Sequence, residues 1–496
     1  MSNFFFAAFK PELLLLGMAL VVSLVDLWVK DAQRRPTYWL TQLTLLAVAA
    51  LHLRAFALGY SNVAMQGMVN ADPLAHLLGG LSALVVAGVL LLSRPYAASR
   101  DLLKGELFTL SLFMVLGVCI MVSARHLLVV YLGLELMSLS LYALVALRRD
   151  HTVSTEAAMK YFVLGALASG FLLYGMSMLY GATGSLSIPE IYNVLGNPDA
   201  GQRPNEAVLV FGLVFVVAGL AFKLGAAPFH MWVPDVYQGA PTVATLLIAT
   251  APKLAALAIT FRLLVEGMFS LAADWQQMMI VLAMFSLVVG NFVAIAQTNL
   301  KRMLAYSTIA QMGFLLLGLA SGVVGGSAQG ALIAHSAALF YAVVYVFTTL
   351  GSFGMILLLS RQGHEAEQLS DFAGLWQRSS WYALVMAIFM LSLAGIPMTV
   401  GFYAKLAILQ AMGATELPFY YGLMVAAVVL SLIGAFYYLR VIKTMFFDPP
   451  AERQAIVAPM DVKGLLTLLA IGTVVLGVVP GKVMGWCTLA VSAILP

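Results

Sequence analysis

The stretch "LAFKLGAAPFHMWVPDVYQGAP", residues 220–241, places Lys223 and His230 in otherwise apolar sequence that also carries Gly225 and Pro228. A proline removes one hydrogen bond from the backbone of a helix. Broken backbone at membrane depth is tolerated only where it is buried in protein or lines a wet cavity. We therefore expect an interrupted transmembrane helix here, with a lysine close to the break.

The composition of the whole chain supports this interpretation. Hydrophobic residues make up 62% of the 496 residues and charged residues only 10%, and the mean hydropathy is +0.97. Apolar runs of about 20 residues, enough to cross a bilayer as helix, recur along the chain and predict an all-α integral membrane protein. Outer-membrane barrels are excluded because their strands alternate over about 10 residues.

The sequence carries no signature of redox chemistry or of nucleic-acid binding. Cys119 and Cys487 lie far apart, and there is no CxxC or Cys/His cluster for zinc or an iron–sulfur centre. There is no GxGxxG that opens a βαβ unit and no P-loop. The net charge of +4 reflects membrane topology. We therefore expect no cofactor, no metal and no nucleic-acid partner for this chain.

The apolar runs predict fourteen spans and no separate soluble domain. The predicted spans are 11–30, 38–58, 74–93, 105–123, 126–147, 157–180, 207–234, 239–265, 275–297, 302–323, 329–359, 380–411, 419–444 and 462–485. The N-terminus has no basic region or cleavage site typical of a signal peptide, so we interpret it as a retained first span. An even number of spans places both termini on one side of the membrane.

The distribution of basic residues predicts which side that is. Lys and Arg are concentrated in the loops that follow odd-numbered spans, for example Lys30, Arg100, Arg148, Lys301 and Arg440. The positive-inside rule makes this the cytoplasmic side. Both termini are then expected to face outward.

Charged residues inside the predicted spans are the main functional signal. Lys160, Lys223, Lys253 and Lys405 lie within spans, and Glu135 is the one carboxylate well inside a span. A lysine at a helix centre costs roughly 2.5–3.5 kcal/mol on insertion scales, and such residues normally mark an ion or proton path. One carboxylate does not neutralise four ammonium groups. Burial disfavours the charged amine and a nearby carboxylate favours it, so a change in their separation would load or release a proton.

Structural alternatives exist for several of these positions. For Glu135 in the fifth span and Lys223 in the seventh, the alternative is a structural ion pair. Lys160 lies four residues after Glu156, so an i,i+4 pair explains it as well as function does. His230 and His335 are candidates for a proton relay, or else hydrogen-bonded core histidines. Lys253 lies in the middle of its span and has the weakest structural explanation.

A second break predicts an internal repeat. The stretch "LAGIPMTVGFYAKL", residues 393–406, combines Gly395 and Pro397 with Lys405. It lies five spans after the first break, and paired Gly/Pro-interrupted spans point to the site of a transporter. We expect an N-terminal three-helix segment (1–104), two five-helix units of opposite orientation (105–265 and 275–445) and a C-terminal helix (446–496).

Five stretches carry a family resemblance: "YLGLELMSLSLYALVAL", "EAAMKYFVLGALASG", "FKLGAAPFHMWVPDVYQGAP", "NLKRMLAYSTIAQMGF" and "GIPMTVGFYAKL". The chain resembles the antiporter-like membrane subunits of bacterial proton-pumping NADH–quinone oxidoreductase (respiratory complex I) along almost its whole length. The lysine in "GFYAKL" favours subunit N over subunit M, which is expected to carry glutamate there. The absence of a lateral helix after span 14 argues against subunit L.

The resemblance implies a fourteen-helix core, two inverted five-helix repeats and a hydrated polar axis at mid-membrane. It assigns Glu135 and Lys223 as the coupled pair of the first half-channel, Lys253 as the central lysine and Lys405 as the terminal lysine of the second half-channel. Three residues are accessory: His230 beside the first break, Lys160 and His335. The chain departs from the larger subunits along span 11, where Tyr341 and Tyr345 replace further charge.

The resemblance also implies a function that depends on partners. Redox energy released in partner subunits, which are expected to hold NAD, FMN, iron–sulfur clusters and quinone, would drive protons through the axis. The expected partners are the other membrane-arm subunits and the lipid bilayer. The alternatives are a subunit of a cation/proton antiporter or of a membrane-bound hydrogenase, or a membrane scaffold with structural lysines.

Overall fold

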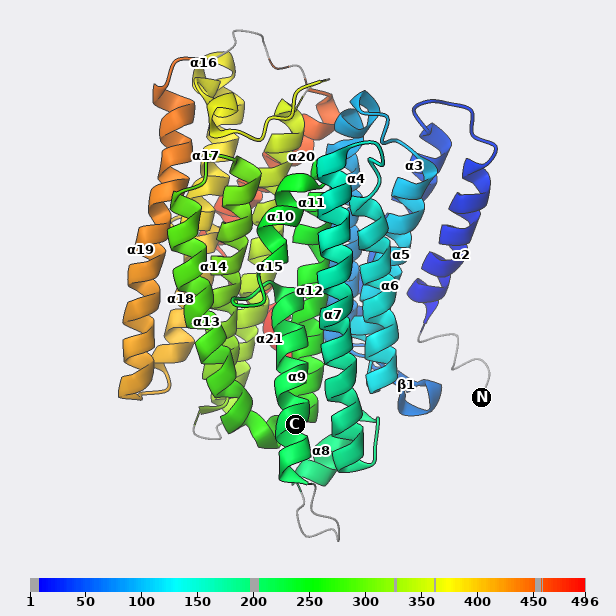
Figure 1. Cartoon of the computed structure of the whole chain (residues 1–496), viewed down its shortest axis with the longest axis vertical. Coiled ribbons are helices and arrows are strands. Elements are labelled where there is room, and N and C mark those ends of the chain that lie inside the picture. The colour runs from blue at the N-terminus through cyan, green and yellow to red at the C-terminus, as the bar shows by residue number, and fades with distance from the viewer. Residues whose placement is uncertain are drawn as a thin grey trace.

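The computed structural model describes residues 9–196, 205–324, 328–360, 363–450, 456 and 458–495. Long helices run side by side along one axis of the molecule (Figure 1). The first half contains α2 (Lys10–Asp26), α3 (Arg35–Ala57), β1 (Asn62–Ala64), η1 (Met65–Gly67), β2 (Val69–Ala71), α4 (Pro73–Ser99), α5 (Gly105–Val122), α6 (Leu127–Val145), α7 (Thr152–Thr183), α8 (Ile188–Gly196), α9 (Glu206–Leu224), α10 (Trp232–Gly239), α11 (Thr242–Ala249), α12 (Ala251–Thr260) and the π-helix η2 (Phe261–Gly267). The second half contains η3 (Phe269–Leu271), α13 (Ala272–Ile295), α14 (Leu300–Ser321), α15 (Ala328–Leu359), η5 (Leu369–Phe372), α16 (Leu375–Arg378), α17 (Ser380–Ala394), α18 (Val400–Gly413), α19 (Pro418–Phe447), α20 (Met460–Val478) and α21 (Gly481–Ser492).

The predicted all-α membrane fold is confirmed. Within the described ranges, twelve helices are long and apolar enough to cross a membrane. Two more elements complete the fourteen predicted spans. The first is α2, with 17 residues, and the second is the interrupted pair α17 and α18. The chain is therefore a multi-pass membrane protein.

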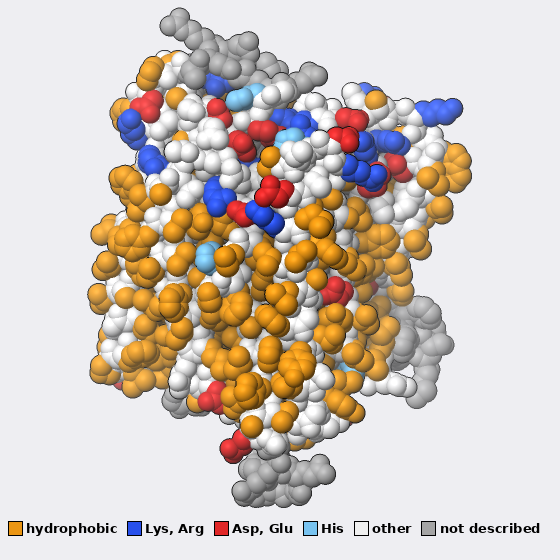
Figure 2. All heavy atoms as spheres, viewed as in Figure 1, with side chains coloured by type: hydrophobic (Ala, Val, Ile, Leu, Met, Phe, Trp, Pro, Cys, Tyr) orange, Lys and Arg blue, Asp and Glu red, His pale blue; other side chains and the backbone are white. Residues whose placement is uncertain are grey.

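Side chains on the visible face match this assignment. Hydrophobic side chains cover the middle of the molecule, and Lys and Arg gather at its upper end (Figure 2). The loops at that end include those after α4 and α6, with Arg100 and Arg148, which were predicted to be cytoplasmic. The same end is called the basic end below.

The core lies around the helices that carry the breaks. Every residue in the most apolar part of Thr242–Gly267 is buried, and so are 94% of the residues in the most apolar part of α14. The helix α15 packs against α4, α11, α12, α14, α17, α18, α20 and α21. At the periphery, α2 and α3 lie at one edge and α19 at the opposite edge (Figure 1). Any polar group on the central helices is thus enclosed by protein.

Close helix pairs are built on small residues. A Cβ atom on Gly117 of α5 would lie 2.5 Å from the backbone nitrogen of Met137 on α6, and one on Gly133 of α6 would lie 2.8 Å from that of Met121. Only glycine permits this separation, as is usual where membrane helices pack closely. The pair fixes α6, which carries Glu135, against α5.

The structure differs from the predicted spans in several places. A short antiparallel hairpin, β1–β2, pairs Asn62 with Ala71 in the connection after α3. The helix α8 lies in the connection 181–206. The predicted eighth span is interrupted at Thr250, whose φ and ψ are −116° and −101°, and the last span breaks between α20 and α21. Pro252 and Pro480 lie at these two breaks, which hydropathy alone does not resolve.

A buried ionic cluster holds the end of the bundle opposite the basic end. Arg262 is fully buried and lies 2.6 Å from Asp72 and 2.9 Å from Glu266. Its guanidinium also donates to the backbone oxygen of Val122 at 3.0 Å. Asp72 in turn caps the N-terminus of α4 by accepting from the backbone nitrogen of Ala75. The cluster therefore joins α4, α5 and the π-helix η2.

Candidate functional site

The two predicted breaks end their helices in the same way. Gly225 after α9 has a φ of +80°, and Gly395 after α17 has a φ of +82°, a conformation that glycine adopts readily. In each case the residue after the glycine donates back to a carbonyl five residues earlier: Ala226 to Ala221 at 2.8 Å and Ile396 to Leu391 at 3.0 Å. This is the Schellman pattern of a helix C-terminus. It leaves the last carbonyls of both helices in need of other donors.

Lysine amines supply those donors at both breaks. The Nζ atom of Lys253 donates to the backbone oxygens of Lys223 at 3.3 Å and Leu224 at 2.8 Å. The Nζ atom of Lys405 donates to the corresponding oxygens of Leu393 at 3.2 Å and Ala394 at 3.0 Å. The C-terminus of a helix carries partial negative charge and favours a cation. The two lysines thus occupy matching positions although they come from different places in the sequence.

The surroundings of the two amines match as well. The Nζ atom of Lys253 lies 5.3 Å from the centre of the Trp232 ring, and that of Lys405 lies 5.1 Å from the centre of the Phe314 ring. Both distances suit a cation–π contact. Lys405 also donates to the hydroxyl of Ser431 at 2.8 Å. In the described part of the chain neither amine has a carboxylate partner.

Lys223 and Glu135 are near each other without forming an ion pair. The Lys223 amine donates to the hydroxyl of Ser138 at 2.8 Å and of Ser169 at 3.5 Å. Ser138 lies one helical turn after Glu135 on α6. The Oε1 atom of Glu135 is buried and has no hydrogen-bond partner among the described residues. The structure therefore does not contain a direct ion pair between Glu135 and Lys223.

Lys160 lies in a surface cluster. Its side chain is 43% exposed and pairs with Glu156 at 2.8 Å and with Asp235 at 2.9 Å. Asp235 on α10 also pairs with Arg302 on α14 at 2.8 Å. The predicted i,i+4 pair is thus present, and the cluster ties α7 to α10 and α14.

The two candidate histidines have different surroundings. His335 on α15 is completely buried, and neither of its ring nitrogens has a partner in the described ranges. The centre of its ring lies 5.7 Å from the centre of the Phe261 ring, in an edge-on arrangement. His230 follows the first break and is partly exposed, with an unpartnered Nδ1 atom. Both histidines thus have at least one buried ring nitrogen without a hydrogen-bond partner in the described ranges.

A cluster of uncharged polar groups lies beside Lys405. The amide of Gln311 on α14 donates to the oxygen of Leu393, which also accepts from Lys405, and to the hydroxyl of Tyr438, both at 3.0 Å. Tyr341 donates to the side-chain oxygen of Gln311. The hydroxyls of Thr308 and Tyr345 lie 2.8 Å apart. The two tyrosines predicted to replace charge along span 11 are both buried in this cluster.

Lys405 also borders free space. A cavity of about 10 Å³, just enough for one water, is lined by Lys405, Gln311 and Tyr341. A second cavity of about 220 Å³ includes Lys405, Phe402 and Ser431 in its lining. The terminal lysine is therefore accessible to water-sized molecules.

Sequence reasoning missed two polar groups. Lys301 was placed in a cytoplasmic loop, but it is the second residue of α14 and is only 2% exposed. Its amine donates to the backbone oxygen of Ala240, the residue that follows α10, at 2.8 Å. His52 and His76, whose Nδ1 atoms lie 3.2 Å apart, form a buried pair, with Glu12 3.9 Å from His52. The "KR" pair at 301–302 resembles an ordinary loop signal, and the histidines are 24 residues apart, so neither grouping has a local signature.

Comparisons with known proteins agree with this architecture. Residues 124–434 match the family described as NADH:quinone oxidoreductase/Mrp antiporter, transmembrane. NADH-quinone oxidoreductase subunit N of Polaromonas naphthalenivorans is 56% identical over 491 residues, which cover 98% of this chain and 97% of that protein. A chain of respiratory complex I from Thermus thermophilus superposes with a TM-score of 0.79 at 31% identity, covering 96% of this chain and 98% of that one. A chain of an archaeal membrane-bound sulfane sulfur reductase superposes with a TM-score of 0.84 at 25% identity, covering 99% of this chain and 98% of that one.

The chain therefore belongs to the NADH:quinone oxidoreductase/Mrp antiporter family of membrane subunits. Within that class it is a member of the NADH-quinone oxidoreductase subunit N family. It is accordingly a subunit of an enzyme complex. Among the described residues no group of three or more His, Cys, Asp or Glu is placed to hold a metal ion.

Proposed function

We propose that this subunit transfers protons across the membrane along an axis of Glu135, Lys223, Lys253 and Lys405, driven by redox energy from its partner subunits. The observation that carries the proposal is the matched pair of helix ends at Gly225 and Gly395. Each is closed by a lysine amine that has no carboxylate partner among the described residues. Backbone carbonyls stabilise an ammonium group without neutralising it. The amine is then held in place whether or not it carries its proton.

The first half of the axis supports a coupling step. Lys223 is held by serine hydroxyls, and its own backbone oxygen accepts from Lys253. A movement of α6 that brings Glu135 toward Lys223 would stabilise the charged amine, and a movement away would release its proton. Lys253 is the next amine to receive it because it is tied to the same helix end.

The second half extends from Lys253 to Lys405 through the hydroxyls and the amide around Gln311, with water completing the path. His335 and His230 are accessory relay groups, since both have buried ring nitrogens without a protein partner in the described ranges. We assign Lys160 a structural role because its amine is already paired twice.

The remaining parts of the proposal concern the setting. NAD, FMN, iron–sulfur clusters and quinone would be bound by partner subunits. The basic end faces the cytoplasm of a bacterial cell, and both termini lie on the periplasmic side of the inner membrane. The gathering of Lys and Arg at one end (Figure 2) supports this orientation.

Two substitutions in the complete complex test the proposal: Lys223→Met and Lys405→Met. Methionine keeps the apolar stem and removes the amine. We expect both variants to assemble in wild-type amounts and to lose proton translocation by about 10²-fold, the lower bound for a positioned acid–base group. A scaffold with structural lysines predicts the opposite, namely poor assembly and normal translocation in the complexes that form.

A further inference from the structure

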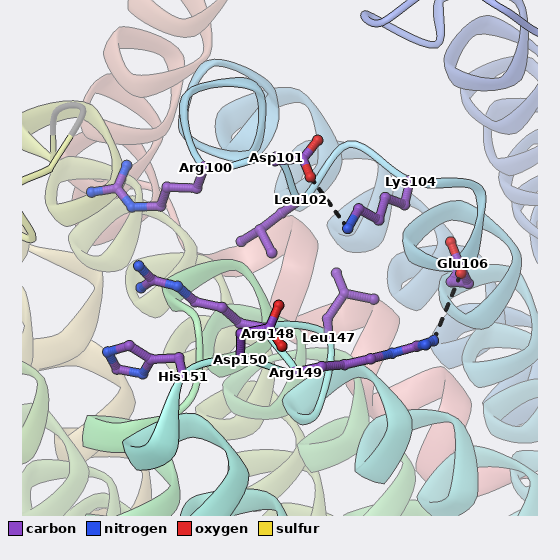
Figure 3. Close-up of a pocket in the computed structure, with 10 residues that line it drawn as sticks. All are labelled: Arg100, Asp101, Leu102, Lys104, Glu106, Leu147, Arg148, Arg149, Asp150 and His151. Atoms are coloured by element: carbon purple, nitrogen blue, oxygen red, sulfur yellow. Dashed lines mark ion pairs between the residues drawn. The ribbon is translucent and has the colours of Figure 1, made fainter.

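A polar cavity opens at the basic end, away from the axis. Its volume is about 400 Å³, room for on the order of ten waters. The loops that follow α4 and α6 line it, and Figure 3 shows Arg100 and Arg148 on one side of it. On the other side, Lys104 and Asp101 form an ion pair of 3.3 Å. The cavity is thus a charged, water-sized space next to the membrane-spanning bundle.

Glu365 touches two of the side chains that line this cavity. It lies in the connection between α15 and η5, and its Oε1 atom accepts from Arg100 and from the hydroxyl of Tyr96, each at 2.8 Å. A nitrogen of Arg148 lies 3.9 Å from the same oxygen. The side chain of Glu365 is 26% exposed, but its Oε2 atom is buried and has no partner among the described residues. One oxygen is therefore held by the protein and the other is left to bind a proton or a water.

The polar groups continue inward from Glu365. The hydroxyl of Tyr96 accepts from the backbone nitrogen of Thr242 at 3.1 Å, and the hydroxyl of Thr242 is another buried atom without a partner in the described ranges. Two residues earlier, the backbone oxygen of Ala240 accepts from the buried amine of Lys301. Glu365 thus reaches the start of α11 through Tyr96, and Lys301 bonds to the residue that follows α10.

We propose that Glu365 is the proton-uptake group of this subunit and that Lys301 receives the proton from it. The proposal rests on the proton translocation proposed above. The carboxylate takes a proton from a hydronium ion in the cavity and becomes a carboxylic acid, leaving water. The acid then protonates the neutral amine of Lys301, which gives a carboxylate and an ammonium group. A carboxylate kept only for structure is expected to have both buried oxygens hydrogen-bonded, and Glu365 has only one.

The test compares Glu365→Gln with Glu365→Asp and Glu106→Gln in inverted membrane vesicles, where the basic end faces the medium. Glutamine keeps the shape of the side chain and an oxygen that accepts the same hydrogen bonds, but it does not take up and release a proton. We expect Glu365→Gln to slow NADH-driven proton uptake by about 10²-fold, the lower end of the range for a positioned acid–base group, and Glu365→Asp to keep most of the wild-type rate. The control, Glu106, lies on the same cavity and pairs loosely with Arg149 at 3.9 Å, so its substitution leaves the rate unchanged.

A pH series separates uptake from a structural role. Lowering the pH of the medium by one unit supplies more hydronium and should recover several-fold of the rate in Glu365→Gln, whereas lost packing would not recover. If Glu365→Gln pumps normally while Lys405→Met does not, the assignment of Glu365 as the uptake group is wrong, but the proposed proton axis is supported. If Lys405→Met also pumps normally, the axis itself is wrong. If neither Glu365 variant assembles, the carboxylate is structural and the uptake proposal is overturned.

Discussion

Replacing Gly395 by alanine should displace the terminal lysine without touching any charge. A Cβ atom at this position would lie 2.8 Å from Cδ and 3.2 Å from Nζ of Lys405, closer than such atoms pack. The φ of +82° adds about 1–2 kcal/mol for any residue with a Cβ atom. The side chain of Lys405 must then move away from the carbonyls that end α17.

The size of the effect follows from the contacts that the amine loses. A hydrogen bond to a charged group contributes about 1.5–3 kcal/mol, and Lys405 makes two to the helix end. Losing one of them lowers the occupancy of the observed position by roughly 10- to 150-fold, since each 1.36 kcal/mol is a factor of ten. We therefore expect proton translocation to fall by at least about tenfold.

The assay is proton translocation by the reconstituted complex, measured with a pH-sensitive dye and normalised to assembled complex. The matched control is Gly184→Ala. Gly184 also has a positive φ, +73°, but a Cβ atom there meets nothing within 4 Å, so only the backbone cost remains. Equal translocation by the two alanine variants would show that the position of the Lys405 amine does not matter, and would refute this reasoning.

Three further predictions follow from other contacts. Ser138→Ala removes the 2.8 Å partner of the Lys223 amine and should reduce translocation several-fold, whereas Ser140→Ala, whose hydroxyl bonds only to backbone, should not; equal rates would contradict the role given to Ser138. Lys160→Met breaks exposed ion pairs worth about 0.2–1 kcal/mol each, so translocation should change less than twofold, and a loss as large as in an axis variant would place Lys160 in the path. Arg262→Met removes the cation beside the buried carboxylate of Asp72, while Glu266 keeps Arg125 at 3.8 Å. It should destabilise the subunit by about 3–5 kcal/mol, seen as a lower melting temperature of the purified complex; an unchanged melting temperature would contradict the buried cluster.

The spans and both breaks were predictable because their causes are local. Twenty apolar residues cross a bilayer, and glycine followed by proline ends a helix within a few residues. Lys253 and Lys405 stood out because a charge in an apolar run is expensive. These expectations need no knowledge of which helices are neighbours.

The contacts of the amines were not predictable because they are tertiary. Lys253 reaches a helix end 30 residues earlier in the chain, and Lys405 reaches one 11 residues earlier. Their equivalence appears only when the two helix ends are compared in space. Lys301 was missed for the same reason, since its burial depends on α10 ending beside it.

The separation of Glu135 from Lys223 also depends on packing. The family resemblance assigned these two charges as a coupled pair, but the hydroxyls of Ser138 and Ser169 hold the amine in the structure. Both serines look like ordinary small residues at a helix interface, so sequence alone gave no reason to select them.

The central claim is that lysine amines on the axis carry protons. It is tested most directly by measuring protons translocated per NADH oxidised in complexes with Lys253→Met, beside Lys463→Met as an exposed control on α20. We predict normal assembly in both, an unchanged ratio for Lys463→Met and a clear fall for Lys253→Met. A wild-type ratio in fully assembled Lys253→Met complexes would contradict the account.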